Sequence, residues 1–233
     1  MDLIFPPLCL ACGSYLATRE KTLHLCHKCG SDIQPIISPL CSLCGMGFNS
    51  CTGHDHLCGS CLQAPPSFKI ARAAVYYTDV VKDMLHRLKY RNDTTVSPAI
   101  QTIISQMDRT AFAAVDLIIP VPLHPNRLRQ RGMNQSLLLA RLFFPTAPER
   151  IVTNQLLRIR DTVPQTSLNG KERRTNMHGA FKVAKPSAIQ GKSICLVDDV
   201  LTTGTTVTEC AGKLVDAGTE DVRILTFARA ARG

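Results

Sequence analysis

From Lys69 onward, short apolar runs alternate with longer segments whose apolar residues recur every three or four positions. The short runs predict buried strands, and the longer segments predict amphipathic helices. Strands are expected at Lys69–Tyr77, Asp116–Val121, Ile194–Val197 and Val222–Ala228, and helices from Val80, from about Asn134 and over Thr205–Ala217. This strand and helix order predicts an α/β fold with a mostly parallel sheet flanked by helices.

Basic residues interrupt the apolar positions of the first expected helix, and we expect them to face solvent: Lys82, Arg87, Lys89 and Arg91. Two other segments lack either periodicity. The stretch PVPLHPNRLRQRGMNQS has three prolines around His124 and then three arginines, which predicts irregular structure. The polar, basic stretch from Leu156 to Val183 predicts one long loop.

The first 66 residues follow a different pattern, because nine of the eleven cysteines precede Ala64. Eight of them form four CxxC pairs: Cys9 and Cys12, Cys26 and Cys29, Cys41 and Cys44, and Cys58 and Cys61. The proline-containing stretch QAPPSF follows. We therefore expect two domains, a double zinc ribbon at 1–66 and the α/β domain at 67–233.

Paired thiolates two residues apart can share one tetrahedral zinc ion. Combining neighbouring pairs gives two closed, structural sites of four cysteines each, although an interleaved combination is also open. His24, His27, Cys51, His54 and His56 could replace a thiolate, and for the last three we favour positions outside the metal site. A thioredoxin-like redox motif would open a helix in a βαβ unit, so four repeats among turn residues favour metal.

The stretch SICLVDDVLTTGTTV, Ser193–Val207, places two acids after an apolar strand and then a threonine-rich turn. In open α/β sheets ligands bind at the carboxyl ends of strands, so Asp198 and Asp199 should reach a ligand there. The turn can surround a phosphate at the start of the next helix. It lacks the lysine of a Walker A loop and the GxGxxG spacing. One phosphate beside a hydroxylated group fits best.

This stretch resembles the motif with which type I phosphoribosyltransferases bind 5-phosphoribosyl 1-diphosphate (PRPP). Together with PVPLHPNRLRQRGMNQ, RIRDTVPQTSLNGKERRTNMHGAF and the CxxC-rich start, it makes nearly the whole chain similar to the ComF/GntX family of competence-associated proteins. The resemblance implies a type I phosphoribosyltransferase-like fold behind the zinc ribbon, with structural zinc and with Mg²⁺ accompanying PRPP.

The resemblance also implies roles for individual residues. Asp198 and Asp199 would be the catalytic acids facing the ribose hydroxyls. The 5′-phosphate would lie among Thr202, Thr203, Gly204, Thr205 and Thr206, and the pyrophosphate beside Val121, Pro122, Leu123 and His124. The segment Arg158–Phe181 would close over the ligand, with Arg160, Gln165, Arg173 and Arg174 as candidate closing residues. Cys195 and Cys210 are expected to be ordinary core residues.

The formal charge of +9 lies entirely after residue 66, which suits a phosphate-rich partner. Resemblance to ComF implies a role in DNA uptake during natural transformation, with Arg127–Arg131 and Lys171–Arg174 contacting single-stranded DNA or import proteins. The alternative is a metabolic phosphoribosyltransferase with an unidentified acceptor. A zinc-ribbon nucleic-acid module fits less well because the ribbon has no basic excess. No apolar run suits a membrane span or a signal peptide, so we expect a cytoplasmic protein.

Overall fold

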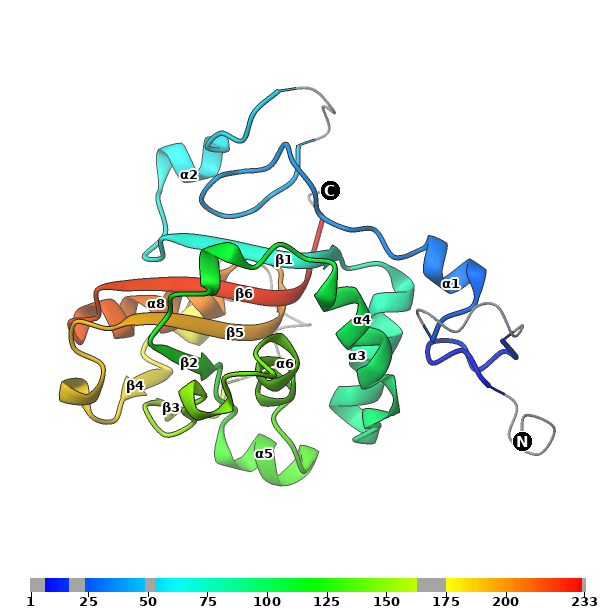
Figure 1. Cartoon of the computed structure of the whole chain (residues 1–233). Coiled ribbons are helices and arrows are strands. Elements are labelled where there is room, and N and C mark those ends of the chain that lie inside the picture. Colours follow the sequence, from blue (N-terminus) through cyan, green and yellow to red (C-terminus); the bar gives the residue numbers. More distant parts are fainter. Residues whose placement is uncertain (1–6, 17–23, 49–52, 163–174, 232–233) are drawn as a thin grey trace.

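A computed structural model of the chain describes residues 7–16, 24–48, 53–162 and 175–231 (Figure 1). Its centre is a four-stranded parallel sheet in the order β1-β6-β5-β2. The strands are β1 (Ile70–Tyr76), β2 (Leu117–Pro120), β5 (Ser193–Leu201) and β6 (Asp221–Arg229). The predicted α/β class, with a parallel sheet flanked by helices, is confirmed.

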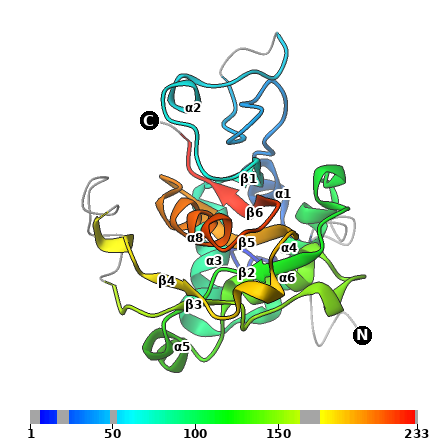
Figure 2. The same cartoon turned by 90° about the vertical axis from the view of Figure 1, so that its left-hand side faces the viewer.

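Both faces of the sheet are buried, which explains why its strands read as continuous apolar runs. Along β5, Cys195 and Val197 pack into one core and Ile194 and Leu196 into the other. The first core lies under α3 (Asp79–Arg91), α4 (Ser97–Ser105) and α6 (Gln135–Phe143). The second lies under α8 (Thr205–Asp216) and a hairpin of β3 (Leu156–Arg158) and β4 (Phe181–Val183), as Figure 2 shows. Cys195 and Cys210 are fully buried, as expected of core residues.

The two segments expected to be irregular contain regular elements, so those predictions were wrong in part. Within the proline-rich segment that begins at Pro120, Pro125–Arg131 forms α5. Proline suits the first position of a helix, the His124 side chain accepts a hydrogen bond from the Asn126 N–H (3.3 Å), and Gly132 ends the helix with φ 72°. Leu156–Val183 begins and ends in the antiparallel strands β3 and β4.

The remaining elements are short connectors around this framework. They include the α-helices α1 (His27–Ser31) and α2 (Gly59–Gln63). They also include the 3-10 turns η1 (Thr94–Val96), η2 (Thr110–Phe112), η3 (Pro148–Arg150) and η5 (Pro186–Ala188). None of the helices in the described part of the chain has the length and apolar character needed to cross a bilayer.

The cysteine-rich segment packs along the outer edge of β1 (Figure 1). The N–H groups of Ala71 and Tyr76 donate to the carbonyls of Leu43 (2.7 Å) and Gln34 (2.8 Å). An uncovered edge strand would leave such groups free to pair with another chain. The cysteine-rich segment therefore covers the edge strand β1 and pairs with its exposed backbone groups.

The first half of the cysteine-rich segment contacts α3. Leu25 and Cys29 join the core that contains the buried leucines of this helix. Arg87 also donates to the carbonyl of Leu10 and forms an ion pair with Asp93 (2.6 Å), with only 22% of its side chain exposed. The prediction that Arg87 faces solvent was wrong, because the helix face it occupies is covered by the cysteine-rich segment.

Candidate functional site

Asp198 and Asp199 lie near the end of β5, at the carboxyl edge of the sheet where open α/β folds bind ligands. The sequence predicted a strand that ends at Val197. Instead β5 continues to Leu201, because β6 runs beside it as far as Arg229. Both acids are thus fixed by a paired strand instead of a loop.

Asp198 occupies the more enclosed position of the two. Its Oδ1 accepts hydrogen bonds from the Ser136 hydroxyl (3.0 Å) and from the Asp199 N–H (2.9 Å). Burial, reinforced by the negative charge of Asp199, raises the pKa of Asp198 to about 7. A carboxyl group of this kind is stabilised in its ionised form by any ligand that donates hydroxyl groups or brings a cation.

Asp199 has a cationic partner that the sequence did not predict. Its Oδ2 lies 2.5 Å from Nζ of Lys89, whose side chain is 25% exposed. Burial acts to lower the pKa of Lys89, but the adjacent Asp199 carboxylate outweighs it, so the pKa of Lys89 is raised. The expectation that Lys89 faces solvent was wrong, whereas Lys82 and Arg91 are exposed.

The threonine-rich turn joins β5 to α8 through Gly204, whose φ of 78° is readily adopted only by glycine. Gly204 is the N-cap of α8, and no side chain caps this helix. The hydroxyls of Thr203 and Thr205 lie 2.8 Å apart. The first turn of α8 therefore directs its backbone N–H groups and the positive end of its dipole into the site.

These elements surround a cavity of about 320 Å³. Of the residues predicted from the sequence, nine line it: Asp198, Asp199, Thr202, Gly204, Thr205, Thr206, Val121, Pro122 and Leu123. Thr203 and His124 do not. The cavity is also lined by Arg127 and Arg131, expected from the sequence to contact DNA, and by Arg158, the first residue of the expected closing segment. Its remaining polar lining was not expected: Tyr77, Lys89, Tyr90, Gln135 and Ser136.

Arg158 lines the cavity from a strand, although the sequence placed it in a loop. It ends β3, is only 8% exposed, and packs with its guanidinium 5.6 Å from the centre of the Phe181 ring. Among the described residues its buried Nε has no hydrogen-bond partner and no carboxylate forms an ion pair with it. Burial, together with the nearby charge of Arg127, lowers the pKa of Arg158. A buried guanidinium without an ion pair among the described residues, at a cavity wall, favours an anionic ligand.

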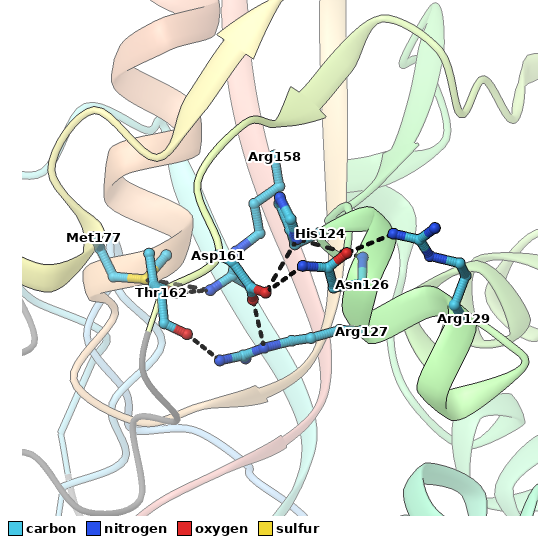
Figure 3. A network of polar contacts seen from close by, with 8 residues as sticks. All are labelled: His124, Asn126, Arg127, Arg129, Arg158, Asp161, Thr162 and Met177. Carbon is cyan, nitrogen blue, oxygen red and sulfur yellow. Dashed lines mark hydrogen bonds and ion pairs between the residues drawn. The ribbon is translucent and has the colours of Figure 1, made fainter.

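A polar network holds the arginine side of the cavity together (Figure 3). Asp161, just beyond β3, accepts a hydrogen bond from Asn126 Nδ2 (2.8 Å) and lies 3.8 Å from Nε of Arg127. Arg127 donates to the carbonyl of Thr162, and Arg158 donates to the hydroxyl of the same threonine. In Figure 3, α5 and the chain after β3 approach each other through these contacts. The network positions Arg127 and Arg158 as a pair.

The candidate closing residues fall in a segment that is only partly described. Arg160 is exposed and donates to the carbonyl of His178 (2.6 Å), and it does not line the cavity. Gln165, Arg173 and Arg174 lie outside the described residues, as does the basic stretch Lys171–Arg174.

The eight cysteines of the CxxC pairs form two clusters in the sequential combination. In each cluster the four sulfurs lie within 4.8 Å of one another: Cys9, Cys12, Cys26 and Cys29 in the first, and Cys41, Cys44, Cys58 and Cys61 in the second. Four convergent thiolates match the closed tetrahedral site that structural zinc prefers. Each site would contribute zinc-binding energy to folding, with no open position for a catalytic water.

The second cluster consists of cysteines, and neither His54 nor His56 belongs to it. The His56 ring stacks on Phe48 with centroids 4.1 Å apart, and its Nδ1 lies 2.9 Å from the His54 carbonyl. His54 is exposed, and Cys51 lies outside the described residues. The four-cysteine cluster is complete without them.

Two arginines of the sheet connect the second cluster to the α/β fold. Arg229 at the end of β6 donates to the carbonyl of Cys44 (2.6 Å), with its other terminal nitrogen 3.8 Å from the Cys44 sulfur. Arg72 of β1 donates to the carbonyl of Ser42 (3.2 Å). Because a zinc ion with four thiolates carries a net negative charge, a guanidinium at this distance stabilises the site.

Comparison with known proteins agrees with this arrangement. Residues 1–62 match the family model of the double zinc ribbon domain. The DNA utilization protein YhgH of Salmonella typhi is 31% identical over 97% of this chain and 99% of its own length. Competence protein F of Haemophilus influenzae is 29% identical over 95% of this chain and 96% of its own. Competence protein ComFC of Bacillus subtilis is 26% identical over 91% and 90%.

Proposed function

The chain belongs to the family of the DNA utilization protein YhgH and the competence proteins, and on this premise we propose that it binds PRPP with Mg²⁺ and serves in DNA uptake or use in the cytoplasm. The cavity at the end of β5 is the PRPP site in this proposal. The 5′-phosphate binds at the first turn of α8, and the ribose hydroxyls bind Asp198 and Asp199. The diphosphate lies towards Arg127 and Arg158.

The observation that supports this assignment is the position of two acids between two anion-binding elements. Asp198 and Asp199 line the same cavity as the α8 N-terminus and the two arginines. A simple inorganic anion would need neither carboxylate, and a neutral sugar would need neither arginine nor helix terminus. A ribose that carries phosphates at both ends would use all of them.

Mg²⁺ fits the same site because its preferred ligands are oxygens of carboxylates, phosphates and water. Bound to the diphosphate, it would neutralise part of the charge that Arg127 and Arg158 also face. The raised pKa of Asp198 agrees with a site that gains from hydroxyl donors or a cation beside the acids.

Contact with single-stranded DNA forms the second part of the proposal. The α5 arginines at positions 127, 129 and 131 lie in a domain that carries the whole positive excess of the chain. Attraction to phosphates through such residues is largely electrostatic and depends steeply on salt. The protein partners in this role would be other components of DNA import.

Isothermal titration calorimetry with PRPP and Mg²⁺ tests the ligand assignment. We expect saturable binding by the zinc-loaded wild type and loss of binding in the double variant Asp198→Asn/Asp199→Asn. The control is Asp216→Asn on the exposed end of α8, whose carboxylate lies outside the cavity lining. Equal affinity of the wild type and the double variant for PRPP would exclude the acids as the ribose site.

A further inference from the structure

The proposed DNA-binding helix and the proposed PRPP cavity share residues. Arg127 and Arg131 belong to α5, and both line the cavity beside Tyr90 of α3. The two helices meet at their C-terminal ends, where a Cβ placed on Gly132 would lie 3.0 Å from Nδ2 of Asn92. The α5 surface therefore continues into the cavity mouth.

Tyr90 is an exposed aromatic residue held in place at this junction. It is 60% exposed, although it lies in the last turn of a well-packed helix. The Arg131 guanidinium lies 5.3 Å from the centre of its ring, and the His86 ring centre lies 4.6 Å away. Proteins that bind single-stranded nucleic acids stack bases on aromatic rings that lie among basic side chains.

The charges around Tyr90 are largely uncompensated. Among the described residues, Arg91, Arg129 and Arg131 form no ion pair with a carboxylate, and Arg127 has only Asp161 at 3.8 Å. We call Tyr90, Arg91, Arg127, Arg129 and Arg131 the Tyr90 surface. It combines positive charge with one accessible ring, which suits a strand whose bases are unpaired better than a duplex, whose bases are already stacked.

We propose that single-stranded DNA binds across the Tyr90 surface with one base stacked on Tyr90, and that DNA and PRPP exclude each other. The inference rests on the proposed function and adds the relation between its two ligands. Both are polyanions, both use Arg127 in this proposal, and Arg131 lines the same cavity. A DNA phosphate at these guanidinium groups occupies the space of the diphosphate, so the cavity is open to PRPP only when DNA is absent. Linkage requires that each ligand weakens the other by the same factor.

Fluorescence anisotropy of a labelled 20-nucleotide dT strand tests both parts. PRPP with Mg²⁺ at about ten times its own Kd should weaken dT binding about tenfold, and unlabelled dT at about ten times its own Kd should weaken PRPP binding about tenfold in calorimetry. Tyr90→Ala should weaken dT binding about fivefold or more, and Tyr90→Phe should retain it. Arg131→Gln should reduce the slope of log affinity against log salt by about 0.7.

Two matched variants control for general effects. Tyr15→Ala removes a tyrosine that is 75% exposed in the first ribbon, and Arg141→Gln removes an exposed arginine from α6 that does not line the cavity. Both should bind dT as the wild type does. A DNA duplex of the same length, whose bases are already stacked, should bind Tyr90→Ala and the wild type with a smaller difference than dT shows.

The possible failures are distinguishable. If both ligands bind the wild type and PRPP leaves dT affinity unchanged or raises it, mutual exclusion is refuted while the proposed function stands. If PRPP does not bind at all, the cavity ligand and with it the exclusion are wrong. If dT binding is unaffected by Tyr90→Ala, the Tyr90 surface is not the DNA site, whatever PRPP does.

Discussion

Asp198→Asn should stabilise the ligand-free protein at neutral and alkaline pH while removing a ligand contact. The asparagine Oδ1 can accept the two hydrogen bonds that Asp198 accepts now, from Ser136 and from the Asp199 N–H. The substitution therefore keeps the local contacts and removes a buried negative charge beside another one. Residues that serve a ligand often cost stability in its absence, and Asp198 should be such a residue.

The magnitude follows from the pKa of Asp198. Burial and the charge of Asp199 raise this pKa from its ordinary value of 3.8 to about 7, so the folded protein binds a proton that the unfolded chain releases. The stabilisation that comes from this proton is complete below about pH 4 and is lost as the pH rises to about 7. Each pH unit in this window is worth about 1.4 kcal/mol, which sums to at most about 4 kcal/mol at pH 8.

Thermal unfolding of the zinc-loaded wild type and Asp198→Asn at pH 5, 6, 7 and 8 measures this effect. The advantage of the variant should grow with pH and level off above about 7, reaching at most roughly 15 °C in Tm for a chain of this size. Asp216→Asn, at a side chain that is 74% exposed, should show no such trend. A Tm difference that does not change with pH, or a variant less stable than the wild type at pH 8, would refute the reasoning about Asp198.

Three further predictions concern the cavity and the second cysteine cluster. PRPP affinity measured by calorimetry should fall as the pH drops below about 7, approaching tenfold per pH unit, because protonation of Asp198 competes with the ribose hydroxyls. Gly45→Ala should destabilise the fold by about 1–3 kcal/mol and lower the Tm, since Gly45 has φ +70° and a Cβ would lie 2.3 Å from the Ala71 carbonyl oxygen. The control is Gly59→Ala, because Gly59 has open space around it. Arg229→Gln should release one of its two zinc ions to a colorimetric chelator at least about tenfold faster than the wild type, whereas Arg229→Lys should change the release rate less. An unchanged release rate in Arg229→Gln would mean that the site at Cys44 needs no guanidinium.

The sequence predicted the parts of the site that come from one continuous stretch. The apolar run, the acid pair and the threonine-rich turn follow each other along the chain, so the pattern placed the strand and the start of α8, although it ended the strand at Val197 instead of Leu201. The four CxxC pairs were equally informative, because metal ligands are read from local spacing.

The residues that the sequence did not predict depend on contacts between distant segments. Lys89 had the pattern of a solvent-facing helix residue, and only the tertiary fold brings it to Asp199 of β5. Arg158 lay in a stretch expected to be a loop, because β3 and β4 are three residues each and pair across a long polar segment. The α5 helix was missed because Pro125 was taken as a breaker, whereas it occupies the first helical position.

A crystal structure of the protein with ribose 5-phosphate and Mg²⁺ tests the central claim most directly. We expect the phosphate within hydrogen-bond distance of the backbone N–H groups at the start of α8, and the ribose hydroxyls at Asp198 and Asp199. A ligand bound outside the cavity, or one whose phosphate lies at Arg127 and Arg158 with no contact to either acid, would contradict it.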